Sequence, residues 1–154
     1  MSEEIQNPVK ILFSFYSNVL DEWTKETMWA EVIDNDKGIY KIDSIPFYAS
    51  VASDDIIFAE YDENEQMLVY TDTIEYSGNS TIQVVLMNAA TDINTIRDGF
   101  SELGCMSEKL NDRYFAMEVP SKLDYQPVKQ RLIELQESEV LDYAESCLSS
   151  NHHY

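Results

Sequence analysis

The sequence predicts an α+β protein, in which a small five-stranded β-barrel-like N-terminal half is joined to a ferredoxin-like β-α-β-β-α-β C-terminal half. Short apolar runs separated by polar turns fill the first half, whereas apolar residues at helical spacing occur only in the second. The 154 residues, 44% of them hydrophobic, suffice for one domain or for two small lobes that share a core. We expect a curled β-sheet or barrel subdomain over residues 1–79 and an α+β subdomain over residues 80–154, together forming one compact unit.

Five short strands are expected in the first half. The run VKILFSFY at residues 9–16 alternates its apolar side chains, and ETMWAEVI at 26–33 is rich in large apolar residues. A turn at 34–38 leads into the short strand IYKI at 39–42. DIIFAEYD and MLVYTDTIEY are separated by the polar ENEQ, so we expect them to form a hairpin. Short strands with polar turns of this kind are typical of a small barrel.

The second half combines strands with two helices. After a strand at 80–87, Asp92 is expected to cap a helix that Gly104 ends, because the apolar residues between them recur every three or four positions. CMSEKL and RYFAMEV flank a turn and predict a hairpin. A second helix should begin near Tyr125, with Pro127 in its first turn. The remaining VLDYAESC could extend that helix or form a last strand. We predict the strand, because it completes the β-α-β-β-α-β order.

Charge is where the composition departs most from the average. The chain has 29 acidic and 10 basic residues, a formal net charge of −19 and a pI near 4.1. Such a field repels nucleic acid and anionic membranes and attracts cationic surfaces, so we expect neither direct nucleic-acid binding nor membrane association. The apolar runs fall short of the roughly 20 residues of a membrane span, and the N-terminus lacks the features of a secretory signal. A cytoplasmic location is therefore expected.

Four carboxylates lie within otherwise apolar strands and could pair as general acid and base, as in a hydrolase. They are Glu31, Glu60, Asp72 and Glu118. Nothing in the sequence shows that any two converge, and outward-facing positions on half-solvated strands explain them better. The acidic turns fit no Ca²⁺ or Mg²⁺ loop, and there is no Gly-rich phosphate loop. We expect neither a metal nor another cofactor.

Nucleophilic catalysis would require a cysteine beside a histidine. The two cysteines, Cys105 and Cys147, lack the spacing of a disulfide framework or a zinc site and are expected to be reduced, buried thiols. The two histidines, His152 and His153, lie at the C-terminus, where we expect a frayed tail that cannot position a base. No catalytic residue is predicted.

Several fragments together resemble one bacterial family, the domain of unknown function forty-two sixty-five. The resemblance extends roughly from Val9 to Ser149, with Ser44 where asparagine is expected. The fragments are TMWAEV at 27–32, IYKIDSIPFYA at 39–49, ASDDI at 52–56, EYSGNSTIQVV at 75–85, ELGC at 102–105, MEVP at 117–120 and DYAESCLS at 142–149. The resemblance implies a bacterial cytoplasmic setting and brings no assigned activity. The physical roles of Pro46, Gly78 and Gly104 in these fragments are expected to be architectural.

The functional hypothesis rests on the absence of basic residues between Lys41 and Arg97, where acidic and aromatic residues are interleaved. Such a surface suits a basic protein partner, because aromatic side chains anchor interfaces and complementary charge accelerates association. We therefore expect a non-enzymatic acidic binding protein, most concretely an immunity or antitoxin-type inhibitor of a nuclease-like bacterial toxin. The expected partner-binding residues, with Tyr61 as anchor, are Asp54, Asp55, Glu60, Tyr61, Asp62, Glu63, Glu65, Tyr70 and Asp72.

Two other functions stay open. Ferredoxin-like sheets and small barrels both host small-ligand-sensing or regulatory sites, which a defined apolar pocket would favour. A hydrolase with paired carboxylates is the third possibility. The same segment is also compatible with rings that lie in the core and acids that only keep the protein in solution.

Overall fold

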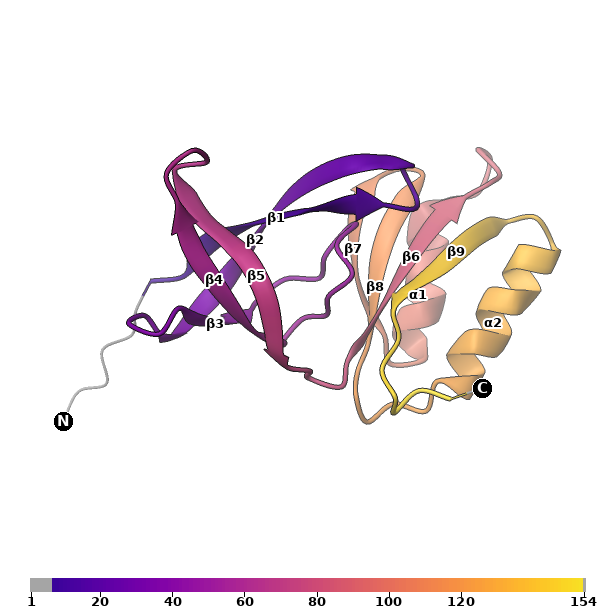
Figure 1. The fold of residues 1–154 in the computed structure, drawn as a ribbon. Coiled ribbons are helices and arrows are strands. Elements are labelled where there is room, and N and C mark those ends of the chain that lie inside the picture. Colours follow the sequence, from indigo (N-terminus) through magenta and orange to yellow (C-terminus); the bar gives the residue numbers. More distant parts are fainter. Residues whose placement is uncertain (1–6, 154) are drawn as a thin grey trace. The chain divides into compact units, whose positions relative to one another are not determined.

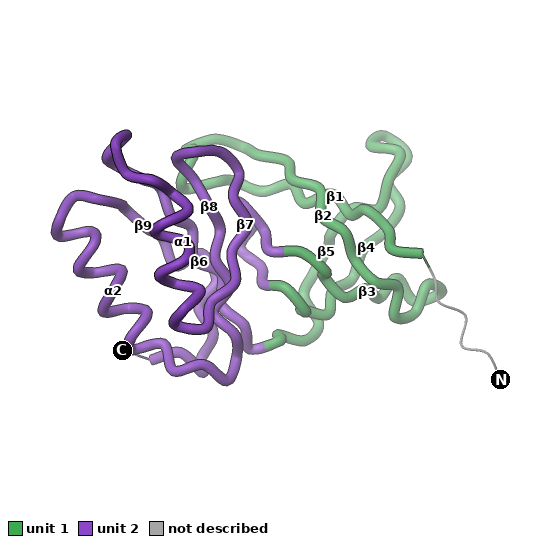
Figure 2. The backbone as a smooth tube through the Cα atoms, turned by 180° about the vertical axis from the view of Figure 1, so that it is seen from behind, with its two compact units in different colours: residues 1–44, 53–77 green, residues 45–52, 78–154 purple. Residues whose placement is uncertain are grey.

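The computed structural model describes residues 7–153, in which nine strands and two helices are divided between two compact units (Figures 1 and 2). Unit 1 comprises residues 1–44 and 53–77, and unit 2 comprises residues 45–52 and 78–154. Residues 45–52, which lie within the expected N-terminal subdomain, are thus part of unit 2. The division of the molecule does not follow a single boundary in the sequence.

The five strands of unit 1 form a closed barrel in the order β1-β2-β3-β4-β5 (Figure 1). They are β1 (Val9–Ser17), β2 (Glu22–Asp34), β3 (Ile39–Ile42), β4 (Ile56–Asp62) and β5 (Met67–Glu75). Neighbouring strands are antiparallel except where β1 meets β5 in parallel, through the pairs Ile11–Leu68 and Leu12–Val69. The interior is filled by alternate side chains such as Ile11, Ile42 and Ile57, none of which is exposed.

Strands β1 and β2 continue beyond the barrel as a two-stranded arm, which we define as residues 14–26. The two strands pair without interruption from Val9–Ala30 to Ser17–Glu22, whereas the pairing of β1 with β5 is confined to residues 11 and 12. Strand structure at residues 22–25 was not expected from the sequence, where we place the start of the second strand at residue 26. The strand conformation of these residues is stabilised by the ladder with β1.

Unit 2 is a four-stranded antiparallel sheet in the order β7-β8-β6-β9, with both helices on one face (Figure 1). Its elements are β6 (Ser80–Leu86), α1 (Ile93–Glu102), β7 (Met106–Asn111), β8 (Tyr114–Val119), α2 (Gln126–Glu137) and β9 (Leu141–Cys147). The core between sheet and helices includes Ile82, Phe115 and Leu132, each fully buried. As predicted, Asp92 caps α1 by accepting a hydrogen bond from the Asn94 amide at 3.0 Å.

The segment 45–52 is held against strands β6 and β8 through its main-chain carbonyls. The Thr81 hydroxyl donates to the Val51 carbonyl at 2.8 Å, and the Gln83 amide donates to the Tyr48 carbonyl at 3.0 Å. The ring of Tyr114 stacks on that of Tyr48, with centroids 4.9 Å apart. Because these side chains alternate with the core residues of β6 and β8, the segment lies on the face of the sheet opposite the helices. Pro46, for which we expect an architectural role, thus lies in a segment of unit 2 and not in the barrel.

The structure also corrects the predicted fold class. The chain is predominantly antiparallel β, with nine strands in two sheets and only two short helices, of 10 and 12 residues. We had expected an α+β protein with a ferredoxin-like C-terminal half. The helices are conspicuous in the sequence because their 3.6-residue period is regular, whereas the polar parts of paired strands carry no local signal. The prediction therefore gave two short helices too much weight.

The C-terminal tail is ordered at His152, which contradicts the frayed tail that we expected. His152 is 3% exposed. Its Nε2 lies 2.9 Å from the Pro120 carbonyl, which can only accept, so Nε2 carries a proton. Nδ1 lies 2.5 Å from the hydroxyl of Ser80, which in turn accepts from the Ser149 amide. These contacts fix the tail to the sheet of unit 2.

Candidate protein-binding surface

The predicted acidic residues gather on the β4–β5 hairpin of unit 1, which we call the acidic hairpin (residues 54–76). Its turn is shaped by Asp62, whose carboxylate accepts hydrogen bonds from the amides of Asn64 and Glu65 at 2.8 and 3.1 Å. Gln66 completes the turn with a positive φ of 56°. The side chain that folds the turn is therefore one of the carboxylates that we expected to bind the partner.

Two further residues of the predicted set have structural roles. Asp55 is 1% exposed, and its carboxylate accepts a hydrogen bond from the Ser77 amide at 2.9 Å. Tyr70 stacks on Phe13 with ring centroids 4.8 Å apart, and its hydroxyl lies 2.7 Å from that of Thr73. Burial raises the pKa of Tyr70 above its ordinary value. The structure thus places Asp55 inside the unit and Tyr70 partly inside it.

The remaining predicted residues lie at the surface of the hairpin. Tyr61 is 63% exposed, which makes it the most accessible aromatic residue of β4 and β5. The exposed carboxylates of the predicted set are those of Asp54, Glu60, Glu63, Glu65 and Asp72. Phe58, also exposed, pairs with Asp72 across the two strands and adds an apolar group to this surface. The hairpin therefore presents acids around aromatic rings.

The lysines of unit 1 do little to offset this negative surface. Lys25 pairs with Glu65 at 2.7 Å, and Lys41 lies 3.7 Å from Asp54 and 4.0 Å from Glu31. Residues 1–79 contain 17 acidic and four basic residues, so these pairs leave a large excess of carboxylates. Exposed pairs of this kind add little stability, but the unpaired excess sets the sign of the field.

The arm carries an apolar surface that the sequence analysis missed. Tyr16, Val19, Leu20 and Trp23 are 45, 41, 41 and 76% exposed. Tyr16 and Trp23 pair directly across the two strands, and their rings meet edge to face with centroids 5.9 Å apart. The signal was available in the stretch YSNVLDEW, where two aromatic residues flank a turn that itself contains Val and Leu.

The carboxylates considered for acid–base chemistry do not form a buried pair. Glu31, Glu60 and Asp72 belong to unit 1 and are exposed to water, so they lack the desolvation that a general acid requires. Glu118 is 5% exposed and belongs to unit 2. The hydrolase hypothesis therefore gains no support from these four residues.

The cysteine and histidine side chains likewise do not assemble a nucleophile. Cys105 is 4% exposed, and burial together with the nearby charge of Glu118 raises its pKa to about 12. A thiol with such a pKa stays protonated and unreactive at neutral pH. His152 is bonded to Ser80, which is itself fully buried and closed to a substrate. Within residues 7–153 no group of three or more His, Cys, Asp or Glu side chains is placed to hold a metal ion.

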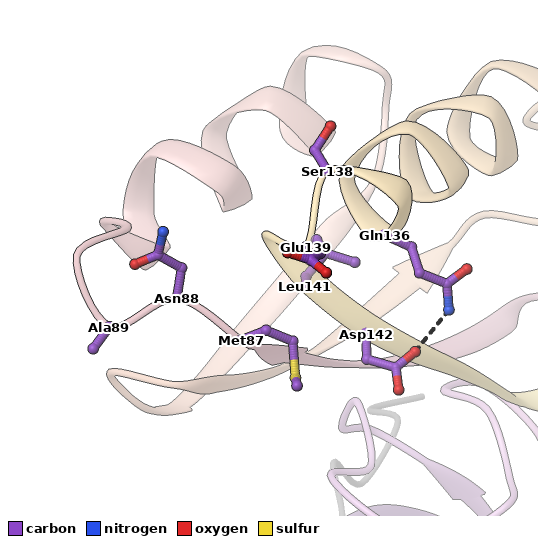
Figure 3. Close-up of a pocket in the computed structure, with 8 residues that line it drawn as sticks. All are labelled: Met87, Asn88, Ala89, Gln136, Ser138, Glu139, Leu141 and Asp142. Carbon is purple, nitrogen blue, oxygen red and sulfur yellow. Dashed lines mark hydrogen bonds between the residues drawn. The ribbon is translucent and has the colours of Figure 1, made fainter.

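A cleft in unit 2 bears on the ligand-sensing alternative (Figure 3). It lies between the loop after β6 and the turn from α2 to β9 and has a volume of about 680 Å³. Met87 in its lining is 57% exposed, and Gln136 and Asp142 face each other through a hydrogen bond of 2.7 Å. A small-molecule site usually encloses most of its ligand within apolar walls. This open and largely polar cleft does not have that character.

The fold and these surfaces define a class of protein: a predominantly antiparallel β-protein of two units, with an acidic hairpin and an apolar arm on its barrel unit. No helix in the described part of the chain is both long and apolar enough to cross a membrane. The chain belongs to the family described as Domain of unknown function (DUF4265), whose model matches residues 26–143.

A solved structure shares the fold. It is described as a novel crystal structure of a hypothetical protein from Neisseria gonorrhoeae, and it is similar over 94% of this chain and 97% of that chain, with a TM-score of 0.79 and 23% sequence identity. At this identity the likeness concerns the fold alone. Comparison with curated proteins gives no match.

Proposed function

We propose that this chain is a non-enzymatic binding protein, whose acidic hairpin engages a basic protein partner. One observation carries the proposal: the hairpin exposes five of its predicted carboxylates together with Tyr61, in a unit whose lysines are too few to neutralise them. Complementary charge speeds the encounter of two proteins, and an exposed aromatic ring supplies contact area once they meet.

The most concrete form of the proposal is an immunity or antitoxin-type inhibitor of a bacterial toxin, acting in the cytoplasm. A nuclease-like toxin has a basic cleft that binds phosphates, and carboxylates spaced along a hairpin can occupy such a cleft in their place. A toxin-like reading frame beside the gene would support this form.

The test compares two sets of charge-neutralising substitutions. In the first, Glu60→Gln, Glu63→Gln and Asp72→Asn remove exposed charges from the acidic hairpin, while Asp55 and Asp62 are kept because they fold it. The matched control removes three exposed charges from the helices of unit 2, through Asp98→Asn, Glu102→Gln and Glu137→Gln. Both sets change the net charge equally, so a difference between them reports on position.

Basic proteins retained by the wild-type chain from its host are purified, and their association rates are measured at about 50 and 300 mM salt. The hairpin set should slow association at least about tenfold at low salt, because local charge steers the encounter, whereas the control set should slow it much less. Retention of no basic protein, or a rate equally insensitive to salt and to both sets, would show that the acidic hairpin does not bind a basic partner.

A further inference from the structure

The tip of the arm exposes four apolar side chains on one short turn. We define the arm tip as Tyr16, Val19, Leu20 and Trp23. Trp23, 76% exposed, has the highest exposed fraction of the large apolar residues in the described chain. Single exposed apolar residues are ordinary, but a contiguous group at the end of a projecting hairpin marks an interaction site. Tryptophan and tyrosine are also the residues that most often dominate binding energy at interfaces.

The arm tip is held in one conformation by its own contacts. The Tyr16 hydroxyl donates to the carboxylate of Asp21, and this bond, with a smaller contribution from burial, raises the pKa of Tyr16. The Ser17 hydroxyl accepts from the Leu20 amide at 3.1 Å. Asp21 itself adopts a positive φ of 55°, which aspartate tolerates better than most residues do. Because the turn is already ordered, little conformational entropy is lost when the tip is bound.

The charges around the tip limit what can cover it. Asp21 and Glu22 directly precede Trp23, and the neighbouring lysine, Lys25, is paired with Glu65 in the turn of the acidic hairpin. This ion pair links the arm to the acidic hairpin. A second copy of a chain with a net charge of −19 would be repelled, and so would an anionic membrane. A protein surface that combines an apolar pocket with lysine and arginine at its rim complements both the tip and its surroundings.

We infer that the arm tip inserts into an apolar pocket, rimmed by cationic side chains, on the partner protein. The inference rests on the proposed function for the cationic character of that partner. It adds a division of roles: the acidic hairpin governs the rate of association, and the arm tip governs how long the complex lasts.

Two synthetic peptides of equal length and charge separate these roles. A Leu/Lys amphipathic helix presents an apolar face rimmed by ammonium groups, whereas its Ser/Lys counterpart presents the same charge without the apolar face. Trp29→Phe leaves Trp23 as the single tryptophan of the chain, since the sequence contains two. We expect the Leu/Lys peptide to bind at least about tenfold more tightly than the Ser/Lys peptide and to shift Trp23 emission to the blue.

The decisive variant is Leu20→Ser with Trp23→Ser in the otherwise wild-type chain, which should bind both peptides with the affinity of the Ser/Lys peptide. Its matched control is Trp29→Ser with Ile33→Ser, which removes two apolar residues of unit 1 that are 48 and 54% exposed and lie outside the arm tip and the acidic hairpin. The control should keep the full preference for the Leu/Lys peptide.

Equal binding of the two peptides by the wild type, or an unchanged preference in the arm variant, overturns the inference. A blue shift of Trp23 emission on raising the protein concentration alone, together with a doubled molecular mass, also overturns it, because a second copy would then be the occupant. The same blue shift on adding phosphatidylcholine vesicles overturns it too, because a lipid would then be the occupant. If Glu60→Gln, Glu63→Gln and Asp72→Asn weaken both peptides while the arm variant weakens neither, the proposed function stands without this inference. If that hairpin set changes neither affinity, the proposed function itself fails.

Discussion

Units 1 and 2 use their apolar residues in different ways. Of the exposed large apolar side chains among the described residues, ten lie in unit 1 and four in unit 2. Unit 2 instead concentrates its apolar residues in one cluster between the sheet and the helices. The sheet of unit 1 closes into a barrel whose core lies inside it, so its outward-facing side chains need not pack against a layer of helices.

The charged residues differ less between the units, because most of the described acids of both units are exposed. In unit 2, Glu145 is partly buried and accepts hydrogen bonds from the Tyr125 hydroxyl, at the start of α2, at 2.7 Å and from the Lys129 ammonium, within α2, at 3.1 Å. Burial lowers the pKa of Lys129, but the hydrogen bonds and charges of Tyr143 and Glu145 outweigh it and raise the pKa. Unit 1 has a buried acid as well, Asp55. It is the contrast in exposed apolar residues which indicates that unit 2 supplies stability and unit 1 supplies surface chemistry.

Loss of a core ring should have the largest effect on stability. Phe115→Ala removes a fully buried side chain from the unit 2 core and should lower the free energy of unfolding by about 3–5 kcal/mol, because the core cannot collapse fully onto the cavity. Phe58→Ala in unit 1, where the ring is 38% exposed, should cost clearly less. Urea denaturation followed by circular dichroism measures both. Equal losses of unfolding free energy in the two variants would show that the units do not differ in how much their apolar side chains stabilise the fold.

Removal of the His152 ring should have the next largest effect. His152→Ala leaves the Pro120 carbonyl with the Leu123 amide as its remaining donor and the Ser80 hydroxyl without one of its partners, so the loss should be about 1–3 kcal/mol. His153→Ala, at an exposed neighbouring position, is the control and should be nearly neutral. The same denaturation experiment applies. An unchanged free energy of unfolding in His152→Ala would contradict a structural role for the ordered tail.

The pH dependence of stability should report on Cys105. Its pKa is raised from 9.0 to about 12 in the folded protein, so the folded state keeps a proton that the unfolded state loses. Stability is therefore fully present below pH 9 and should fall above it, by roughly 1 kcal/mol at pH 10. Cys105→Ala should remove this part of the slope between pH 9 and 10.5. An identical slope in wild type and variant would show that Cys105 does not contribute.

The smallest effect on stability is expected at the acidic hairpin. Tyr61→Ser changes a side chain that is 63% exposed, so the free energy of unfolding should change by less than about 0.5 kcal/mol. Thermal unfolding by calorimetry is sensitive enough to set this limit. A loss comparable to that of His152→Ala would mean that Tyr61 supports the barrel and is not free to anchor a partner.

The sequence was informative wherever the signal is local. Helix α1 begins after the predicted cap Asp92, and α2 begins beside Tyr125 with Pro127 in its first turn, because capping and proline geometry depend on a few adjacent residues. Strand β9 was chosen correctly over a longer helix. Gly104 follows α1 with a φ of 105°, a conformation that favours glycine, and a side chain there would collide with Leu123.

The sequence failed where partners are distant. Nothing near Asp55 shows that it bonds to the Ser77 amide, 22 residues later. His152 looked like part of a loose tail because its partners, Ser80 and Pro120, are remote in the chain. Which of the predicted binding residues are exposed and which are buried depends on such long-range contacts, and these could not be predicted from the sequence. The prediction of the fold class was wrong for the same reason, because the fold class depends on strand pairing between distant residues and not on helix periodicity.

The path of the chain between the units has a consequence for inheritance. The backbone passes from unit 1 to unit 2 at residue 45, returns at 53 and leaves again at 78. No single cut in the gene separates the two units. A fragment beginning at residue 78 lacks the main-chain carbonyls that accept hydrogen bonds from the Thr81 and Gln83 side chains. Recombination at one point therefore cannot transfer either unit alone, and each unit must be inherited together with part of the other.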